Sequence, residues 1–311
     1  MAVKDFTSVF SKYFVVGFFL PAYLALVSLW LAASSGFVPH LLDQYKQSTQ
    51  LLILGVVAGV AGLVLSGASR QITRLFEGYP VARMSGWFIL GLIPRAALAL
   101  QRQSYDRVVA RLDKSKFSVG ERQRALSALD RLYPSREALL PTRLGNAIRA
   151  FERHSNKRWG IDGVTIWPRI DALLSTEERE THVDSQITFY AFLNATVGAI
   201  VVGVCLVVDQ AVHAPVPAWL SPLYAIPFVL AYILYRLAIG PATDWGDAVR
   251  SSIDLHRLEV YEKLGVRRPT SFSDERELAV TVSQMLLYGR PLLGDDHWRQ
   301  DKIEDGGANG A

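Results

Sequence analysis

The sequence predicts an all-α membrane protein, in which four transmembrane helices form a bundle and further helices form a cytosolic body beside the membrane. Four apolar runs each have the roughly 17 to 25 residues that a helix needs to cross a hydrocarbon core of about 30 Å. Lys and Arg are concentrated between the second and third runs and after the fourth run. The runs cover residues 13–33, 51–69, 187–208 and 219–239.

Basic residues are distributed very unevenly between the loops. Segment 70–186 holds 20 Lys and Arg and the tail after Leu234 holds 10, whereas loop 34–50 holds only Lys46 and loop 209–218 holds none. Basic residues close to membrane helices are retained on the cytoplasmic side. We therefore expect a multi-pass plasma membrane protein with both termini and segment 70–186 in the cytoplasm.

The first hairpin, residues 1–69, begins with a run that has some features of a signal peptide. Lys4 and Lys12 precede it and small residues follow it at 32–36. A signal core usually spans about 7 to 15 residues. This run is longer and contains Pro21, which favours an uncleaved first span over a cleaved signal.

Small residues recur every three or four positions within the second and third runs. Such grooves let membrane helices approach closely, either inside one chain or between copies in a homo-oligomer, and both arrangements remain open. The predicted packing residues are Gly55, Gly59, Gly62, Ala195, Ala199 and Gly203. Asn194 and Thr196 are the most polar groups deep in the third run, and the first three runs carry no charge. A proton-coupled transporter or charged pore is therefore not favoured.

The cytosolic segment 70–186 shows helical periodicity. Residues 84–94 form an apolar stretch too short to cross, which suits a surface, re-entrant or buried element. Apolar side chains at helical spacing predict one helix around Tyr105–Leu112 and another around Leu144–Phe151, with Thr142 as its cap. Ser175 and Glu178 form a capping box for a helix that continues into the third run.

The second membrane hairpin, residues 187–239, is followed by C-terminal cytosolic helices over 240–298. Gly240 and Pro241 are expected to interrupt the fourth helix. An amphipathic helix then runs to about Gly265, and a last helix begins near Ser273 or Asp274 and ends at Gly289. The Gly-rich residues 299–311 are expected to be disordered.

Motifs for catalysis are missing from the sequence. It has no phosphate-binding loop, nucleophile elbow or His-Glu-x-x-His zinc motif, and Cys205 is its only cysteine. We predict no catalytic residue, no metal site and no cofactor, so a non-catalytic role is favoured. Nucleic acid binding is not expected, because no basic run with interleaved aromatic residues occurs.

Several polar residues nevertheless suggest possible sites. Glu178 and His182, four residues apart, could hold a divalent cation, although a solvated helix face is the preferred interpretation. His256 lies on an apolar stripe, which favours a hydrogen-bonded interior histidine over a ligand. Arg250 and Asp254 have the spacing of a helix-surface ion pair.

A set of donors in segment 70–186 is the candidate anion or lipid-headgroup site. Its residues are Arg143, Asn146, Arg149 and Arg169. The alternative is that Arg143 or Arg149 pairs with Asp162, or with acids of the tail, and holds the cytosolic body together. The segment carries 20 basic and 13 acidic residues, an excess of +7 that would attract anionic membrane lipids or would only enforce topology.

Three short segments together resemble a known family. LPTRLGN at 140–146, Trp-Pro-Arg at 167–169 and DLHR at 254–257 resemble a widespread but functionally uncharacterised family of bacterial four-span integral membrane proteins. The resemblance implies four spans in a bacterial inner membrane. It implies no known activity, so no site residue is transferred from it.

Three functions remain open at the level of sequence. The first is an oligomeric scaffold or signalling protein whose cytosolic body binds a protein partner, as yet unknown, or anionic lipid. The second is a channel or membrane-perturbing effector. The third is a membrane-surface enzyme that acts on a lipid or phosphate compound through the Arg143 to Arg169 region.

Overall fold

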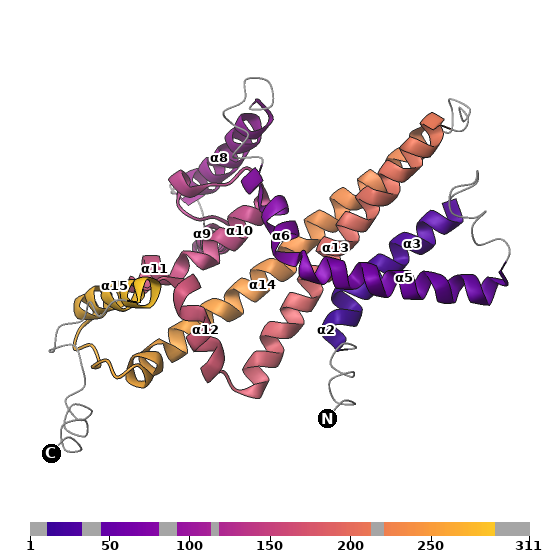
Figure 1. The fold of residues 1–311 in the computed structure, drawn as a ribbon. Coiled ribbons are helices and arrows are strands. Elements are labelled where there is room, and N and C mark those ends of the chain that lie inside the picture. The colour runs from indigo at the N-terminus through magenta and orange to yellow at the C-terminus, as the bar shows by residue number, and fades with distance from the viewer. Residues whose placement is uncertain (1–10, 33–44, 81–91, 113–117, 213–220, 290–311) are drawn as a thin grey trace, which may run out of the picture. The chain divides into compact units, whose positions relative to one another are not determined.

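The computed structural model describes residues 11–32, 45–80, 92–112, 118–212 and 221–289, and it confirms the all-α class (Figure 1). No β-strand forms within these ranges. The chain divides into two compact units. Unit 1 comprises Met1–Pro80 and Val183–Ala242, and unit 2 comprises Val81–His182 and Thr243–Ala311.

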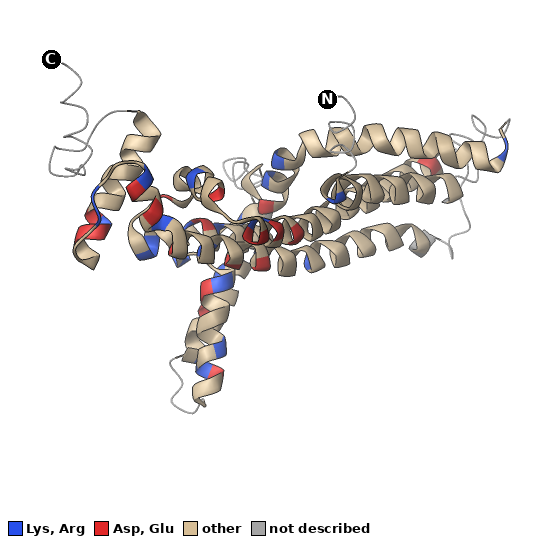
Figure 2. Cartoon of the chain, turned by 90° about the horizontal axis from the view of Figure 1, so that it is seen from below, with Lys and Arg blue, Asp and Glu red and all other residues tan. Residues whose placement is uncertain are grey.

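Four helices are long and apolar enough to cross a membrane, as the sequence predicts. Among the described residues these candidate spans are Lys12–Leu31, Gln47–Gly67, Thr176–Val212 and Leu223–Lys263. Charged side chains are sparse along the apolar stretches and frequent in unit 2 (Figure 2). The chain therefore has the build of a multi-pass membrane protein.

The first span of unit 1 contains a turn of π-helix. It consists of α2 (Lys12–Phe14), the π-helix η1 (Val15–Phe19) and α3 (Leu20–Ala32). Pro21 has no N–H, so it cannot donate to the carbonyl of Gly17 four residues earlier. The buried Asn194 amide donates to that carbonyl instead, with Nδ2 2.8 Å from the oxygen. A polar side chain thus satisfies the backbone group that proline leaves open.

The second span, α5 (Gln47–Gly67), uses only part of its small-residue pattern for packing inside the chain. Ala58 is fully buried, and a Cβ at Gly62 would lie 3.2 Å from Phe19 Cα. A Cβ at Gly55 or Gly59 would meet nothing within 4 Å. Gly62 is therefore a packing residue of the monomer, whereas Gly55 and Gly59 are not. Helix α6 (Ser69–Glu77) follows.

The third and fourth spans lie in α13 (Thr176–Val212) and in η4 (Ser221–Ala225) with α14 (Ile226–Lys263). A Cβ at Gly203 would lie 2.8 Å from the Phe228 ring, so this glycine lets the two helices approach. Ala199 is also buried, as predicted, whereas Ala195 is only half-buried.

Unit 2 begins with two helices that pack against each other, α8 (Leu92–Leu112) and α9 (Val119–Leu132). The rings of Tyr105 and Tyr133 meet edge to face at 5.7 Å. Ser118 and Glu121 form a capping box at the start of α9. Helix α8 contains the helix expected from the apolar spacing around Tyr105–Leu112.

Four further elements of unit 2 lie between α9 and α13. They are η3 (Arg136–Ala138), α10 (Arg143–Glu152), α11 (His154–Trp159) and α12 (Gly163–Leu173). The Thr142 hydroxyl accepts from the Gly145 N–H at 3.0 Å, which confirms the predicted cap of α10. Gly160 ends α11 with a φ of 78°, a left-handed conformation that glycine adopts without a steric penalty.

The core of unit 2 is built around α14 and α15 (Phe272–Tyr288). A Cβ at Gly246 would lie 2.4 Å from the Phe151 ring, so α14 approaches α10 very closely. Helix α15 begins one or two residues before the predicted start, because Ser271 caps it by accepting from the Asp274 N–H. The fully buried side chains of this core include Leu144, Ile161, Ile166, Ile170, Ile253, Tyr261 and Leu278.

The predicted break at Gly240 and Pro241 is wrong. Helix α14 continues through both residues and contributes to both units. Ala238 and Ala242, which flank the proline by three and one positions, are fully buried. Packing around this point holds the helix together, as neighbouring helices often do for prolines in membrane segments.

Three expectations fall wholly or largely outside the described residues. Of the apolar stretch 84–94, only its last three residues are described, as the first turn of α8. The expectation of disorder for 299–311 concerns residues that are not described, and so does the question of a cleaved N-terminus for residues 1–10 and 33–44.

Candidate functional site

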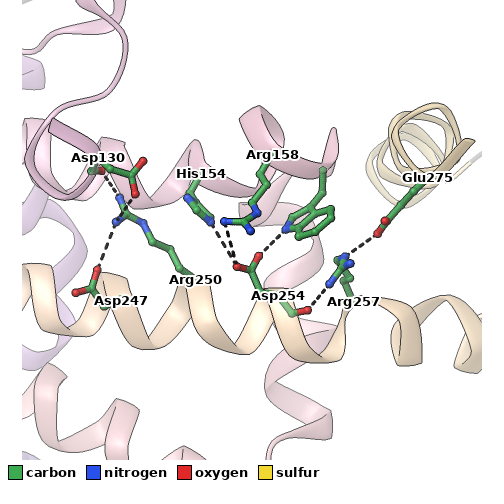
Figure 3. Close-up of polar contacts among 9 residues, drawn as sticks. Asp130, His154, Arg158, Asp247, Arg250, Asp254, Arg257 and Glu275 are labelled. Carbon is green, nitrogen blue, oxygen red and sulfur yellow. Dashed lines mark hydrogen bonds and ion pairs between the residues drawn. The ribbon is translucent and has the colours of Figure 1, made fainter. Parts of the chain in front are cut away.

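Helix α14 presents four charged side chains of alternating sign within unit 2. They are Asp247, Arg250, Asp254 and Arg257, which we call the charged row of α14. Intervals of three or four residues place side chains on one face of a helix. Figure 3 shows this row directed toward residues of three other elements of the unit. The charged row is therefore where the helices of unit 2 meet through polar contacts.

Arg250 connects α14 to the end of α9. Its side chain is 9% exposed, and its Nη1 lies 3.3 Å from Asp247 Oδ1 and 3.5 Å from Asp130 Oδ2. Its Nη2 also donates to the Asp130 carbonyl at 2.7 Å. Burial lowers the pKa of Arg250, and the carboxylates of Asp130 and Asp247 oppose that shift. The guanidinium remains charged at neutral pH because its pKa starts above 12.

Arg131 adds a second bridge between α9 and α14. Its Nη2 lies 2.6 Å from Asp247 Oδ2 and 3.0 Å from Asp244 Oδ1. Its side chain is about two-fifths exposed, so water screens these pairs more than those of Arg250. The two arginines together attach α9 to the first turns of α14 in unit 2.

Asp254 connects α14 to α11. The Trp159 indole N–H donates to Asp254 Oδ1 at 2.5 Å, and His154 Nε2 lies 3.7 Å from Oδ2 (Figure 3). Arg158 is at the limit of an ion pair, 4.0 Å away. Burial, assisted by the charge of Arg250, lowers the pKa of His154 from 6.5, so its imidazole is neutral at pH 7.

Arg257 connects α14 to α15. Its guanidinium carbon lies 3.5 Å from the centroid of the Trp159 ring, a cation–π contact. Its Nε donates to Glu275 Oε1 at 2.6 Å, and both side chains are mostly buried. Its Nη1 donates to the Asp254 carbonyl. The tryptophan is thus held between two members of the charged row.

An open pocket of about 380 Å³ lies along this row. Three carboxylates, two guanidinium groups and the His154 imidazole contribute to its wall. Ser127 and Ser251 also line it, but neither hydroxyl forms a hydrogen bond with His154 in the described part of the chain. Among the described residues no group of three His, Cys, Asp or Glu side chains is placed to hold a metal ion. The charges largely compensate one another.

Helix α13 meets α14 through two histidines. His256 Nε2 lies 3.0 Å from Glu178 Oε1, and this hydrogen bond raises the pKa of His256 and lowers that of Glu178 to about 2. His182 is buried, its Nε2 lies 2.8 Å from the Ser252 hydroxyl, and burial lowers its pKa. His256 is hydrogen-bonded, as predicted, but it is half-buried rather than interior.

Glu178 and His182 do not converge on a cation. Glu178 binds His256 and caps its own helix through Ser175, whereas His182 contacts Ser252 and the Trp167 ring. The alternative interpretation of a solvated face is also wrong for His182, which is 5% exposed. Both residues instead belong to the contact between α13 and α14.

The four predicted anion-site residues do not form a common site. Asn146 is fully buried, and its amide both accepts from and donates to the Leu140 backbone, at 2.6 and 3.0 Å. Arg149 Nη1 donates to the Ala138 carbonyl at 3.1 Å, and Arg169 Nη1 donates to the Thr165 carbonyl at 2.8 Å. Only Arg143 is exposed.

Asp162 also has a local role. It caps α12 by accepting from the Thr165 N–H at 2.7 Å. The LPTRLGN segment therefore folds as a turn that Asn146 closes onto the preceding backbone, followed by the capped helix α10. These contacts stabilise unit 2 locally.

The sequence contains a signal for the charged row. Arg250 and Asp254 were expected to pair with each other, yet Arg250 binds Asp130 and Asp247 while Asp254 binds Trp159. Charges of alternating sign at intervals of three, four and three residues on a partly apolar helix indicate a polar face with partners. Asp130 lies 120 residues from Arg250 and Trp159 lies 95 residues from Asp254, so helix periodicity alone does not identify these two partners.

A scan against protein-family models gave no match, and searches of curated proteins and of solved structures gave no significant match.

Proposed function

We propose that this chain is a non-catalytic, multi-pass membrane component that acts as an oligomeric scaffold or signalling protein. Its unit 2 lies in the cytoplasm and binds a protein partner or anionic lipid. The resemblance to bacterial four-span membrane proteins places it, in this proposal, in a bacterial inner membrane.

One observation carries the proposal. Helices α13 and α14 each join an apolar span to the polar contacts of unit 2 without a break. In α14 that continuation is the charged row, to which α9, α11 and α15 attach. A helix shared in this way lets a change among the spans alter the helices of unit 2, and the reverse.

The contacts of the charged row support a structural role for these residues rather than a catalytic one. Asp254, Arg257 and Arg250 each bind groups from two or more positions of unit 2. Arg257 and Glu275 form a mostly buried pair, whereas the carboxylates that bind Arg250 are about half-exposed. Removing one partner of a buried pair is strongly destabilising, because the other charge is left uncompensated. A row of such contacts is suited to keep unit 2 in a defined conformation for binding.

Two glycines with open space beside them on α5 support association between copies. Gly55 and Gly59 lie one turn apart and have open space where a side chain would be, and the surrounding surface is apolar. In a bilayer, such a strip allows close contact with another helix. We therefore assign the oligomer contact to this strip.

The test is the mass of the full chain in detergent, measured by light scattering after size exclusion. We expect the native chain to form one defined oligomer and the Gly55→Leu/Gly59→Leu variant to form a smaller species. The matched control is Val56→Leu/Val60→Leu, which adds volume to exposed neighbouring positions of the same helix and should keep the native mass. A native chain that is monomeric at all concentrations would overturn the oligomeric scaffold.

A further inference from the structure

The exposed face of α8 has the composition of a helix that lies on a membrane surface. With 3.6 residues per turn, its exposed centre consists mainly of small and apolar side chains, with Gln103 and Asp106 as its polar members, and two arginines lie on each side of that centre. The centre is formed by Leu92, Ala96, Ala99, Gln103, Asp106 and Ala110, and the flanks by Arg95 with Arg102 and Arg107 with Arg111. Leu92 is 61% exposed.

This face is distinct from the one that packs on α9. The apolar stripe through Tyr105, Val108 and Leu112 is half-buried on the α9 side. The exposed face therefore remains after the helix has met its neighbour in unit 2. Leu100, also 61% exposed, adds apolar surface beside it.

The chain's own acids leave three arginines of this face without an ion pair among the described residues. The one acid on α8, Asp106, is bound by Arg136 through two hydrogen bonds of 2.9 and 3.1 Å. Arg102, Arg107 and Arg111 form no ion pair among the described residues. Helices α8 and α9 together contain seven arginines and three acids, an excess of +4.

A shallow depression of about 490 Å³ marks the middle of this face. Ala99, Gln103 and Ala110 line it together with Arg102, Asp106 and Arg107, and the Asp106 carboxylate is bound by Arg136. Guanidinium groups bind phosphate oxygens through paired N–H donors, and their long stems can lie along apolar surface. The depression thus places guanidinium donors beside small side chains, which suits a phosphate headgroup.

We propose that the exposed face of α8 docks on the surface of an anionic phospholipid bilayer. Its alanine and leucine side chains enter the boundary of the acyl region, and Arg102 and Arg107 bind lipid phosphates. The apolar centre favours a bilayer over an acidic protein or a nucleic acid, neither of which offers acyl chains to it. This inference rests on the proposed function and names the lipid that unit 2 binds.

The experiment uses the full chain reconstituted in nanodiscs. A Gln103→Cys change in a Cys205→Ser background places an environment-sensitive fluorophore at the centre of the face, since the chain has one cysteine. We expect a blue shift in discs with about a third phosphatidylglycerol relative to phosphatidylcholine discs. High salt should reverse the shift, because it screens the attraction between exposed charges.

The Arg102→Gln/Arg107→Gln variant should lower the docked-to-free ratio about 30-fold, roughly fivefold for each arginine removed from an anionic surface. The matched control is Arg153→Gln/Lys157→Gln, which removes the same charge from exposed positions at α11 that form no ion pair in the described chain. This control should dock like the native chain.

Three results would overturn the proposal. The first is an identical emission spectrum in both kinds of disc. The second is a loss of docking in the Arg153→Gln/Lys157→Gln control equal to that in Arg102→Gln/Arg107→Gln. The third is the same blue shift caused by polyglutamate or RNA in phosphatidylcholine discs. The last result would assign the face to a soluble polyanion. The mass of the oligomer, measured on the same samples, separates a failure of lipid docking from a failure of the proposed scaffold.

Discussion

At the scale of single residues, Arg250 is the side chain that joins α9 to α14 most directly. We expect Arg250→Ala to lower the free energy of unfolding by about 1 to 3 kcal/mol, because the Asp130 carbonyl loses its donor and two carboxylates lose a cation. The thermal unfolding midpoint in detergent, followed by tryptophan fluorescence, measures this change.

The control for that change is Arg153→Ala, which removes an exposed arginine with no ion pair in the described chain. Its effect should stay within about 0.5 kcal/mol. If both variants unfold at the native midpoint, the charged row does not hold unit 2 together.

The His256 and Glu178 pair makes a prediction about pH. The folded pKa of His256 is raised by its bond to Glu178, so the pair stabilises the folded state fully below pH 6.5. That contribution disappears as pH rises through the raised pKa. The difference in unfolding midpoint between the native chain and His256→Gln should be largest below pH 6.5 and should shrink above it.

Two other histidines contribute to stability with the opposite pH dependence. The useful quantity is therefore the difference in unfolding midpoint between the native chain and His256→Gln. Burial lowers the pKa of His154 and of His182, so their contributions are present above pH 6.5 and are lost as pH falls. The contributions of His154 and His182 are the same in the native chain and in His256→Gln, so they cancel in the difference. A difference that grows with pH would contradict the assigned role of Glu178.

At the scale of elements, close approach between helices depends on particular glycines. Gly246→Ala would place a Cβ 2.4 Å from the Phe151 ring, and we expect it to destabilise unit 2 by about 1 to 3 kcal/mol. Gly120→Ala in α9 meets nothing within 4 Å and should be neutral or stabilising. Unfolding midpoints that fall in the reverse order would contradict the contact between α10 and α14.

The first span and α13 are joined by a polar contact that can be tested separately. Asn194→Leu leaves the Gly17 carbonyl without its side-chain donor, and we expect a loss of about 1 to 2 kcal/mol. The matched change Thr196→Val should have a smaller effect, because that hydroxyl donates to the Phe192 carbonyl of its own helix. Equal midpoints for the two variants would argue against a role for Asn194 in span packing.

At the scale of the whole molecule, the distribution of basic residues predicts the topology. We expect a cysteine at Gln123 to react with a membrane-impermeant maleimide only after permeabilisation, and a cysteine at Tyr45 to react in intact cells. A Cys205→Ser background removes the native thiol. Labelling of position 123 in intact cells would contradict the cytoplasmic placement of segment 70–186.

Much of the fold could be predicted from the sequence because the signals are local. The capping pairs at Thr142 and at Ser175 with Glu178 were both identified, since each depends on residues three positions apart. The prediction at Pro241 failed because the missing N–H is a local property, whereas the packing that keeps α14 continuous is not. Asn146 was misread as a possible ligand because sequence does not reveal its full burial.

The sequence by itself determined the all-α class and the four apolar helices, because span length, hydropathy and capping depend on neighbouring residues. Only the tertiary structure decided that Gly62 faces inward while Gly55 and Gly59 remain open. It also decided that the charged row of α14 binds α9, α11 and α15. The partners in these contacts lie far apart along the chain, so their meeting depends on how complete helices pack.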